Sequence, residues 1–305
     1  MISCARRMHP TFKTIALIGR YADPTVADAM LALAIHGLDR GVRVLVDEGV
    51  TLPFAAGIER LPEDALPREA ELLVAVGGDG TLLYAARLAE GRDVPLLGIN
   101  RGKLGFLADI SATEMQERFD DVLDGRYSRD LRHRLQARLL NPGQPERRAL
   151  ALNDVVLQKR ETGRMLDFES SIDGHFVNAH GGDGLVIATS TGSTAYALSC
   201  GGPIVAPALD ALVLAPVCPH TLSDRPIVVS RLSTIEIRLL AHAPVRAEVT
   251  CDGVVVGELS PEGRLLVEPT DSVVTLLHPP GYDYYRILRS KLHWGRGARL
   301  GHPDP

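Results

Sequence analysis

The pattern of apolar and polar residues changes near residue 130 of the chain. Before that point, short apolar runs at 15–19, 42–46, 71–76 and 94–99 alternate with segments in which apolar residues recur about every fourth position. Such runs are typical of strands buried on both faces, and the four-residue spacing is typical of helices. Strands that alternate with helices are joined by parallel crossovers, so this part is predicted to be a doubly wound, Rossmann-like α/β domain.

The expected helices carry end signals. Asp23 followed by Pro24 predicts an N-cap with proline at the first helical position, and Gly41 predicts the end of that helix. A later helix is expected to start from a capping box, in which Ser111 and Glu114 exchange hydrogen bonds with each other's backbone N–H groups.

After residue 130 the chain consists of short segments enriched in β-branched residues. Turn signals such as Asp173-Gly174 separate them, and this pattern predicts an antiparallel β-sandwich. One helix is expected inside the sandwich at 193–200, and a last helix at 283–292 is expected to return to the first domain. The predicted domains are residues 1–128 with 281–305, the α/β domain, and residues 129–280, the all-β sandwich.

Composition narrows the class of protein. The 305 residues include 33 Lys and Arg against 38 Asp and Glu, a net charge of −5, whereas a nucleic-acid-binding protein usually carries a basic excess. No apolar run approaches the roughly 18–20 residues of a membrane span, and no secretory signal is recognisable at the start. Four cysteines lie far apart, which favours reduced thiols in a cytoplasmic protein (Cys4, Cys200, Cys218 and Cys251).

The sequence GGDG occurs twice, first at 77–80 between an apolar run and an expected helix. That position is the carboxyl end of a parallel strand, where open α/β sheets bind ligands. Glycines there can adopt positive φ and leave N–H groups uncovered beside the positive end of a helix dipole, which suits phosphate. Asp79 could then accept a proton from an attacking hydroxyl or help to hold a divalent cation. The alternative is a tight turn in which Asp79 caps the helix.

The second GGDG, at 181–184, precedes a strand and a segment rich in hydroxyl side chains at 189–194. Hydroxyls at the start of a helix suit ribose, phosphate or a purine edge, although an ordinary N-cap has the same composition. Asn153 and Asp154 interrupt an expected apolar strand, which indicates either a site or a bulge or turn. The P-loop motif and the third glycine of a dinucleotide-binding G-x-G-x-x-G are missing, since Leu83 stands at the latter position.

Five longer blocks together resemble the NAD kinase family in its bacterial form, and the resemblance covers nearly the whole chain. The blocks are VGGDGTLL (76–83), GINRGKLGFLAD (98–109), ALNDVVL (151–157), DGLVIATSTGSTAYALSCGGPIVAP (183–207) and LAPVCPHTLSDRPIVV (214–229). The family has an N-terminal α/β domain, a C-terminal β-sandwich and a last helix that returns to the first domain. Its members transfer the γ-phosphoryl group of ATP to the 2′-hydroxyl of the adenosine ribose of NAD, with a divalent cation, giving NADP and ADP.

The resemblance also implies roles for individual residues. Asp79 resembles the general base, and Gly77, Gly78, Gly80 and Thr81 would line the phosphates of ATP. The residues that would bind NAD are Asp79, Gly80, Asn153, Asp154, Arg164, Asp183, Thr191, Thr194, Ala195, Tyr196 and Ser199. No dedicated set of metal ligands is expected, so a divalent cation, Mg²⁺, would arrive with ATP. The family's members are homodimers or homotetramers, so one of these states is expected here.

Two positions depart from many relatives. Val254 stands where many of them have Gln, and Gly181 stands where some have a polar or basic side chain. Gly181 leaves room near the nicotinamide, so weak discrimination between NAD and NADH is expected. His220 belongs to a matching block but has no assigned step, and a buried structural histidine is an equal interpretation. The alternative functions are another kinase with a GGDG loop, acting on a lipid or a sugar phosphate, and a non-catalytic module that senses a dinucleotide.

Overall fold

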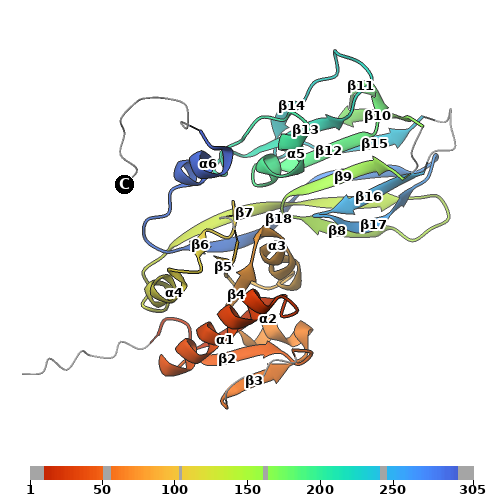
Figure 1. Cartoon of the computed structure of the whole chain (residues 1–305). Helices are drawn as coiled ribbons and strands as arrows, with labels where there is room; N and C mark the ends of the chain where they lie inside the picture. The colour runs from red at the N-terminus through yellow and green to blue at the C-terminus, as the bar shows by residue number, and fades with distance from the viewer. Residues whose placement is uncertain (1–9, 51–55, 103–104, 161–163, 241–245, 295–305) are drawn as a thin grey trace, which may run out of the picture. The chain divides into compact units, whose positions relative to one another are not determined.

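The computed structural model describes residues 10–50, 56–102, 105–160, 164–240 and 246–294 (Figure 1). The chain forms two compact units. It begins in the first unit, continues through the whole of the second and returns to the first. The first unit comprises residues 1–131 and 275–305, and the second comprises residues 132–274. The division expected from the sequence, after residues 128 and 280, lies within a few residues of this one.

The first unit is built on a parallel sheet with the strand order β3-β2-β1-β4-β5. Every neighbouring pair in this series is parallel, and the order is that of a doubly wound dinucleotide-binding fold. The strands are β1 (Thr14–Gly19), β2 (Arg43–Asp47), β3 (Ile58–Leu61), β4 (Leu72–Gly77) and β5 (Leu96–Asn100). Strand β3 was not expected from the sequence, because it lacks a continuous apolar run.

Both faces of this sheet are covered, as the apolar runs predicted. Ile15 of β1 belongs to a core that also contains Met30 of helix α1 and Phe119 of helix α4. On the opposite face, Leu82 of α3 lies so close to Gly98 of β5 that a Cβ on the glycine would be 2.7 Å from it. The helices are α1 (Pro24–Asp39), α2 (Leu66–Glu69), α3 (Asp79–Leu88), α4 (Met115–Leu123) and α6 (Tyr284–Leu292), with a short 3₁₀ turn, η1 (Glu63–Ala65).

The helix ends agree with the sequence at α1 but not at α4. The Asp23 carboxylate accepts the N–H of Thr25 at 2.9 Å, as expected for an N-cap. At α4 the helix begins after Glu114, and the Ser111 hydroxyl donates to the Glu114 carboxylate at 2.8 Å. The expected capping box is therefore wrong, because the two side chains bond to each other rather than to backbone N–H groups.

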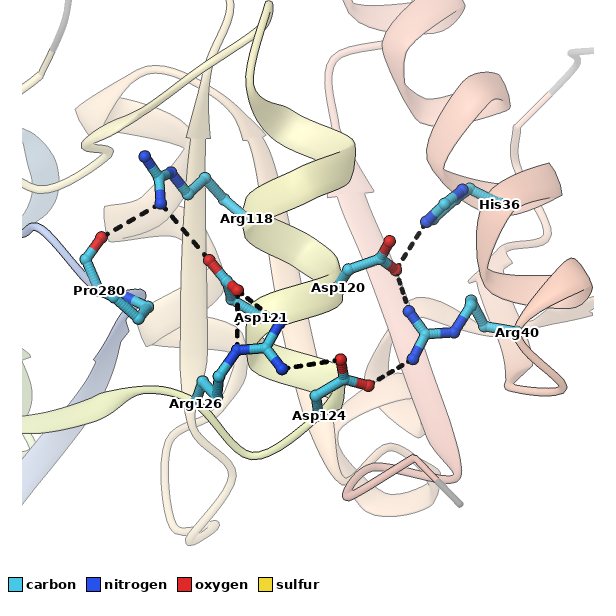
Figure 2. A network of polar contacts seen from close by, with 8 residues as sticks. All are labelled: His36, Arg40, Arg118, Asp120, Asp121, Asp124, Arg126 and Pro280. Atoms are coloured by element: carbon cyan, nitrogen blue, oxygen red, sulfur yellow. Dashed lines mark hydrogen bonds and ion pairs between the residues drawn. The ribbon is translucent and has the colours of Figure 1, made fainter. Parts of the chain in front are cut away.

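A network of ion pairs joins α1 to α4 at the surface of the first unit (Figure 2). His36 and Arg40 of α1 both contact Asp120 of α4, and Arg40 also reaches Asp124. Arg126 pairs with the acidic residues at the end of the same helix. These groups are partly exposed, so each pair contributes about 0.2–1 kcal/mol to stability.

The second unit is an antiparallel β-sandwich, as predicted. One sheet contains β10 (Leu166–Ile172), β11 (His175–Gly182) and β15 (Ile235–Leu239), with β7 (Ser128–Leu140), β8 (Arg147–Ala151) and β18 (Arg264–His278). The other contains β9 (Asp154–Lys159), β12 (Gly184–Thr189), β13 (Ala211–Val217), β14 (Ile227–Ser230), β16 (Ala247–Cys251) and β17 (Val254–Leu259). Phe168 of the first sheet and Leu185 of the second share one apolar core.

The helix expected at 193–200 is not continuous. A 3₁₀ turn, η2 (Gly192–Thr194), is followed by the short helix α5 (Tyr196–Ser199), and the backbone at Ala195 between them is non-helical. The last helix, α6, belongs to the first unit, which confirms the prediction that it returns there. It is reached through β18, whose residue Leu276 pairs with Leu96 of β5, and a small strand, β6 (Ile110–Ser111), also pairs with β5. None of the described helices has both the length and the apolar composition needed to span a membrane.

Candidate active site

A cavity of about 690 Å³ opens in the first unit at the carboxyl ends of the parallel strands. Its walls come from the residues that follow β1, from 77–81 after β4, and from 100–102 after β5. Strand β1 has β2 on one side and β4 on the other, so the chain reverses its direction of winding between β1 and β4. Doubly wound sheets bind ligands at this switch point, so the first GGDG lies where a ligand is expected.

Asp79 is the first residue of α3, and its carboxylate is held by backbone groups of another segment. Phe106 N–H donates to Oδ2 at 2.8 Å, and the N–H groups of Leu107 and Ala108 donate to Oδ1 at 3.0 Å each. The N-cap of α3 is Gly78, and no side chain caps this helix. The interpretation of Asp79 as a helix cap is therefore wrong.

Among the described residues, only three hydrogen bonds reach the Asp79 carboxylate, and they leave one acceptor position without a donor. A carboxylate has about four lone-pair positions, two on each oxygen. Two donors occupy Oδ1 and one occupies Oδ2, so one lone pair of Oδ2 is left. Asp79 also lines the cavity. The arrangement can therefore fix the carboxylate and still accept a proton from a group bound there.

Gly105 makes this arrangement possible, although the sequence analysis did not single it out. A Cβ at this position would overlap Asp79 Oδ1 and would lie 3.0 Å from the carbonyl oxygen of Ala108. Only glycine lets the segment approach the carboxylate so closely. The signal was present in the block 98–109, but the contact with Asp79 joins distant parts of the sequence.

The glycines of the first GGDG serve two different purposes. A Cβ on Gly77 would overlap the Thr81 hydroxyl, so packing requires that glycine. A Cβ on Gly78 or Gly80 would meet no atom within 4 Å. None of the three has positive φ, so that expectation is wrong. Gly78 and Gly80 instead leave the floor of the cavity bare at the N-terminus of α3, where an anion is favoured.

Three basic side chains line the same cavity: Arg20, Arg101 and Lys291. The Nε of Arg101 is buried and donates no hydrogen bond within the described structure. Positive side chains beside a helix N-terminus suit a polyphosphate group. The sequence analysis did not predict any of these three residues as part of the site. Lys291 carries no local signal, because it lies in α6, far along the chain from the GGDG loop.

A second set of predicted residues gathers in the other unit. Asn153 and Asp154 lie at the start of β9, where Asp252 accepts the N–H groups of Leu152, Asn153 and Asp154 at 2.8, 2.7 and 3.1 Å. Burial, with the nearby charge of Asp252, raises the pKa of Asp154 to about 7. The buried carboxylate of Asp154 therefore lies close to the half-buried carboxylate of Asp252, at the turn between β8 and β9.

The segment at 191–196 packs against Asn153. A Cβ on Gly192 would overlap the Asn153 carbonyl, and Thr189 N–H donates to that carbonyl at 2.9 Å. Burial raises the pKa of the Tyr196 hydroxyl, and the thiols of Cys200 and Cys218 and the charges of Asp183 and Asp154 add to this effect. The Oδ1 atom of Asn153 is buried and accepts no hydrogen bond from any described residue.

The hydroxyl side chains of this segment are mostly engaged within the protein. Thr189 donates to the Leu152 carbonyl at 2.6 Å, and Ser193 donates to the Ser190 carbonyl at 2.7 Å. The Thr191 hydroxyl accepts a hydrogen bond from Arg132 at 3.2 Å, and Thr194 donates to the Thr191 carbonyl at 3.3 Å. These hydroxyls therefore stabilise the backbone of residues 189–194. Ala195 and Tyr196, which follow directly, remain partly exposed.

The other predicted residues are less enclosed. Asp183 pairs with Lys159 Nζ at 2.6 Å, and its side chain is 31% exposed. Ser199 is exposed at the end of α5, and Arg164 is exposed just before β10.

The buried histidine of this region is not the one considered in the sequence analysis. His220 is exposed, so its interpretation as a buried structural residue is wrong. His180 of β11 is buried instead, with Nδ1 2.7 Å from Asp224 and Nε2 2.8 Å from the Ser170 hydroxyl. This chain of three groups fixes the loop that contains Asp224 to the edge of the sandwich.

Comparisons with known proteins cover both units. Residues 16–127 match the model of the ATP-NAD kinase N-terminal domain, and residues 152–278 match that of the ATP-NAD kinase C-terminal domain. The NAD kinase of Methylococcus capsulatus is 44% identical over 289 residues, which cover 94% of this chain and 99% of that protein. The NAD kinase of Azoarcus sp. is 42% identical over 294 residues, covering 96% and 99%.

Two solved structures are similar over nearly the whole chain. Yeast NADH kinase complexed with NADH has a TM-score of 0.87 and 26% identity, covering 97% of this chain and 91% of that one. An NAD kinase from Archaeoglobus fulgidus in complex with ATP has a TM-score of 0.70 and 26% identity, covering 92% and 98%. With both family models matched in order along the chain, this protein belongs to the NAD kinase family.

Proposed function

We propose that the protein transfers the γ-phosphoryl group of ATP to the 2′-hydroxyl of the adenosine ribose of NAD, with Asp79 as the general base. The observation that carries this assignment is the Asp79 carboxylate, which is fixed by three N–H groups and keeps one lone pair of Oδ2. It lies in a cavity whose lining includes five glycines and three basic side chains. Membership of the NAD kinase family supports the two substrates.

In the proposed step, the 2′-hydroxyl oxygen attacks the γ-phosphorus of ATP. The new O–P bond forms as the bond between the γ-phosphorus and the β-γ bridging oxygen breaks, and ADP leaves with that electron pair. The hydroxyl proton passes to Oδ2 of Asp79. A positioned base contributes about 10²–10⁴-fold to the rate. Arg20, Arg101 and Lys291 would hold the charged phosphate oxygens in place, and the buried Nε of Arg101 supplies a donor for one of them.

The divalent cation is proposed to enter with ATP rather than to reside in the protein. Within the described ranges, no group of three or more His, Cys, Asp or Glu side chains could hold a metal ion. Of the two carboxylates that line the cavity, Asp23 caps α1 and Asp79 holds the segment 105–108. The residues present therefore do not fit a dedicated site. A bound Mg²⁺ would neutralise charge on the β- and γ-phosphates, with its remaining ligands from water.

The residues at 153–154, 183 and 191–196 are proposed to bind NAD. The buried Oδ1 of Asn153, which accepts no hydrogen bond from the described residues, supports this proposal, because a buried acceptor without a donor costs free energy unless a ligand supplies one. Gly181 supports acceptance of NADH as well as NAD, since it places no charged or polar side chain on β11 beside Asp183. Arg164 and Ser199 complete the proposed set from exposed positions.

The assembly is proposed to be a homodimer or homotetramer in the cytoplasm, with no nucleic-acid or membrane partner. The edge strands of the two sheets support self-association, because they expose large apolar side chains. On β11 these are Phe176 and Val177, and on β14 they are Ile227 and Val228. Exposed apolar groups on sheet edges favour contact with another protein surface.

The test is an assay of NADP formed from NAD, ATP and magnesium. The Asp79→Asn variant should lose at least 10²-fold in turnover while its thermal unfolding stays cooperative. Asp120→Asn, a similar change in the ion-pair network of the same unit, is the matched control and should keep wild-type turnover. Near-normal turnover of Asp79→Asn would remove Asp79 from the mechanism.

A further inference from the structure

A polar cluster around the buried side chain of His278 lies in the first unit, outside the cavity. His278 ends β18 and is only 2% exposed. Its Nδ1 lies 3.0 Å from Asp109 Oδ2, and its Nε2 lies 3.4 Å from Asp130 Oδ2. The imidazole stacks on Tyr282, with ring centroids 3.7 Å apart. The proposed reaction uses none of these groups directly, so the cluster needs another explanation.

Asp109 connects this cluster to the general base. It follows directly after Phe106, Leu107 and Ala108, the three residues whose N–H groups hold the Asp79 carboxylate. The segment is closed upon itself, because Gly105 N–H donates to the Ala108 carbonyl at 3.0 Å. One end of the segment therefore reaches Asp79, and the other end is fixed through Asp109 to His278.

We propose that His278 is a positioning residue for the phosphoryl transfer. By holding Asp109, it fixes the three donors on Asp79, so that the remaining lone pair of Oδ2 stays directed at the bound ribose hydroxyl. The inference rests on the proposed function of Asp79 as the base. It adds that the geometry of the base is set from the far end of the chain, by the residue that ends the last strand.

The physical reason is the burial of Asp109. Its side chain is 8% exposed, and its Oδ1 has no hydrogen-bond partner among the described residues. Without the imidazole, this carboxylate would be buried with no donor on Oδ2 either, so the segment would move to let water reach it. A displacement of about 1 Å at a catalytic group costs roughly 10²-fold in rate. The N–H donors of residues 106–108 would move with it.

The geometry of the two imidazole nitrogens allows a sharp test. In His278→Asn the amide nitrogen can occupy the position of Nδ1 and keep the bond to Asp109. In His278→Gln the amide reaches the position of Nε2 and keeps only the contact with Asp130. We expect His278→Gln and His278→Ala to lower kcat about 10–100-fold, with KM for ATP and NAD within about threefold, and His278→Asn to recover most of the loss.

Two further variants separate positioning from general stability. His36→Ala removes a His–Asp pair of the same unit, between α1 and α4 (Figure 2). It should lower the melting temperature slightly and leave kcat unchanged. Asp130→Asn should also leave kcat unchanged, because Asp130 lies outside the segment 105–109. If His278→Ala does not fold, Asp109→Asn takes its place, and it should lower kcat in the same way.

The outcomes distinguish this inference from the function on which it rests. In the Asp79→Asn background, His278→Gln should have no further effect on the residual rate, because the base is already missing. Wild-type kcat in His278→Gln, or equal losses in His278→Gln and His278→Asn, would overturn the positioning role. If Asp79→Asn itself kept normal turnover, the assignment of the base would fail instead.

Discussion

The two GGDG sequences have the same four residues and different structures. At 77–80 the motif ends a buried parallel strand and begins α3, and its aspartate is fixed by backbone groups of a distant segment. At 181–184 it joins β11 of one sheet to β12 of the other sheet, and its aspartate pairs with Lys159. The first motif therefore exposes bare backbone to a cavity, whereas the second packs its backbone against neighbouring strands.

The glycines show this difference most clearly. In the first motif, Gly78 and Gly80 have open space where a Cβ would be, so the packing of the fold does not require glycine there. In the second motif, a Cβ on Gly182 would lie 2.9 Å from the Val217 carbonyl, and one on Gly184 would overlap the Leu157 carbonyl. The same residue type serves ligand approach in one place and strand packing in the other.

The largest expected difference is between the two aspartates. Asp79→Asn should lower kcat by about 10²–10⁴-fold, because the amide cannot accept the proton. An amide nitrogen would also have to face one of the three donors of residues 106–108. Asp183→Asn should instead raise KM for NAD about tenfold and change kcat little, because it removes a charged hydrogen-bond acceptor from binding. Steady-state kinetics with both variants checks this, and a greater kcat loss in Asp183→Asn would contradict it.

The last glycine of each motif gives the next largest contrast. Gly184→Ala should destabilise the protein by about 2–4 kcal/mol, because its methyl group would overlap a backbone carbonyl that cannot move cheaply. Gly80→Ala should leave stability unchanged or raise it by about 0.5–1 kcal/mol, as in other helices. Its methyl group would still enter the cavity, so kcat/KM for ATP should fall. Urea unfolding and ATP kinetics measure the two effects, and equal loss of stability in both variants would contradict the comparison.

The stability of the region around Asp154 has a pH dependence of its own. In the folded state Asp154 has a pKa of about 7, raised by burial and by Asp252. Between its ordinary value and 7, the unfolded chain releases the proton and the folded chain keeps it, so stability falls as pH rises. Asp154→Asn removes this loss of stability. The free energy of unfolding of the variant, relative to that of the wild type, should therefore rise by about 2 kcal/mol between pH 5 and pH 8. Urea unfolding at both pH values tests it, and parallel pH profiles would refute it.

The first glycine of the second motif gives the smallest expected effect. Gly181 places no side chain beside Asp183, and the thioether of Met165 lies near it, since a Cβ there would be 3.0 Å from Sδ. Gly181 carries no charged donor that could distinguish the nicotinamide ring from its reduced form. The rate of phosphorylation of NADH should therefore lie within about tenfold of the rate for NAD. Parallel assays with the two dinucleotides decide this, and no detectable turnover of NADH would refute it.

The sequence predicted those parts of the fold that depend on local pattern. Strands β1, β2, β4 and β5 are continuous apolar runs, and burial on both faces of the sheet explains why they were found. Strand β11 was missed because it is an edge strand with mostly exposed residues, so its pattern carries no clear alternation. The prediction of one helix at 193–200 was wrong because the backbone at Ala195 is non-helical. The composition of the segment does not indicate this break.

The candidate site was predictable only where a motif marks it. The position of Asp79 at the end of β4 follows from the order of elements. Its hydrogen bonds to Phe106, Leu107 and Ala108 do not, because they join parts of the chain 27 to 29 residues apart. Lys291, which also lines the cavity, lies even further along the chain from Asp79. The roles assigned to the NAD-binding residues stay predictions for the experiments above.

The discontinuity of the first unit also determines when the enzyme can become active during synthesis. A nascent chain that has emerged from the ribosome only as far as residue 274 contains the whole GGDG loop but lacks His278 and Lys291. The cavity at this loop would lack the part of its wall that Lys291 forms, and His278 would not yet hold Asp109. Turnover should therefore begin only after the segment that contains His278 and Lys291 has been synthesised and has docked on a domain that began to form first.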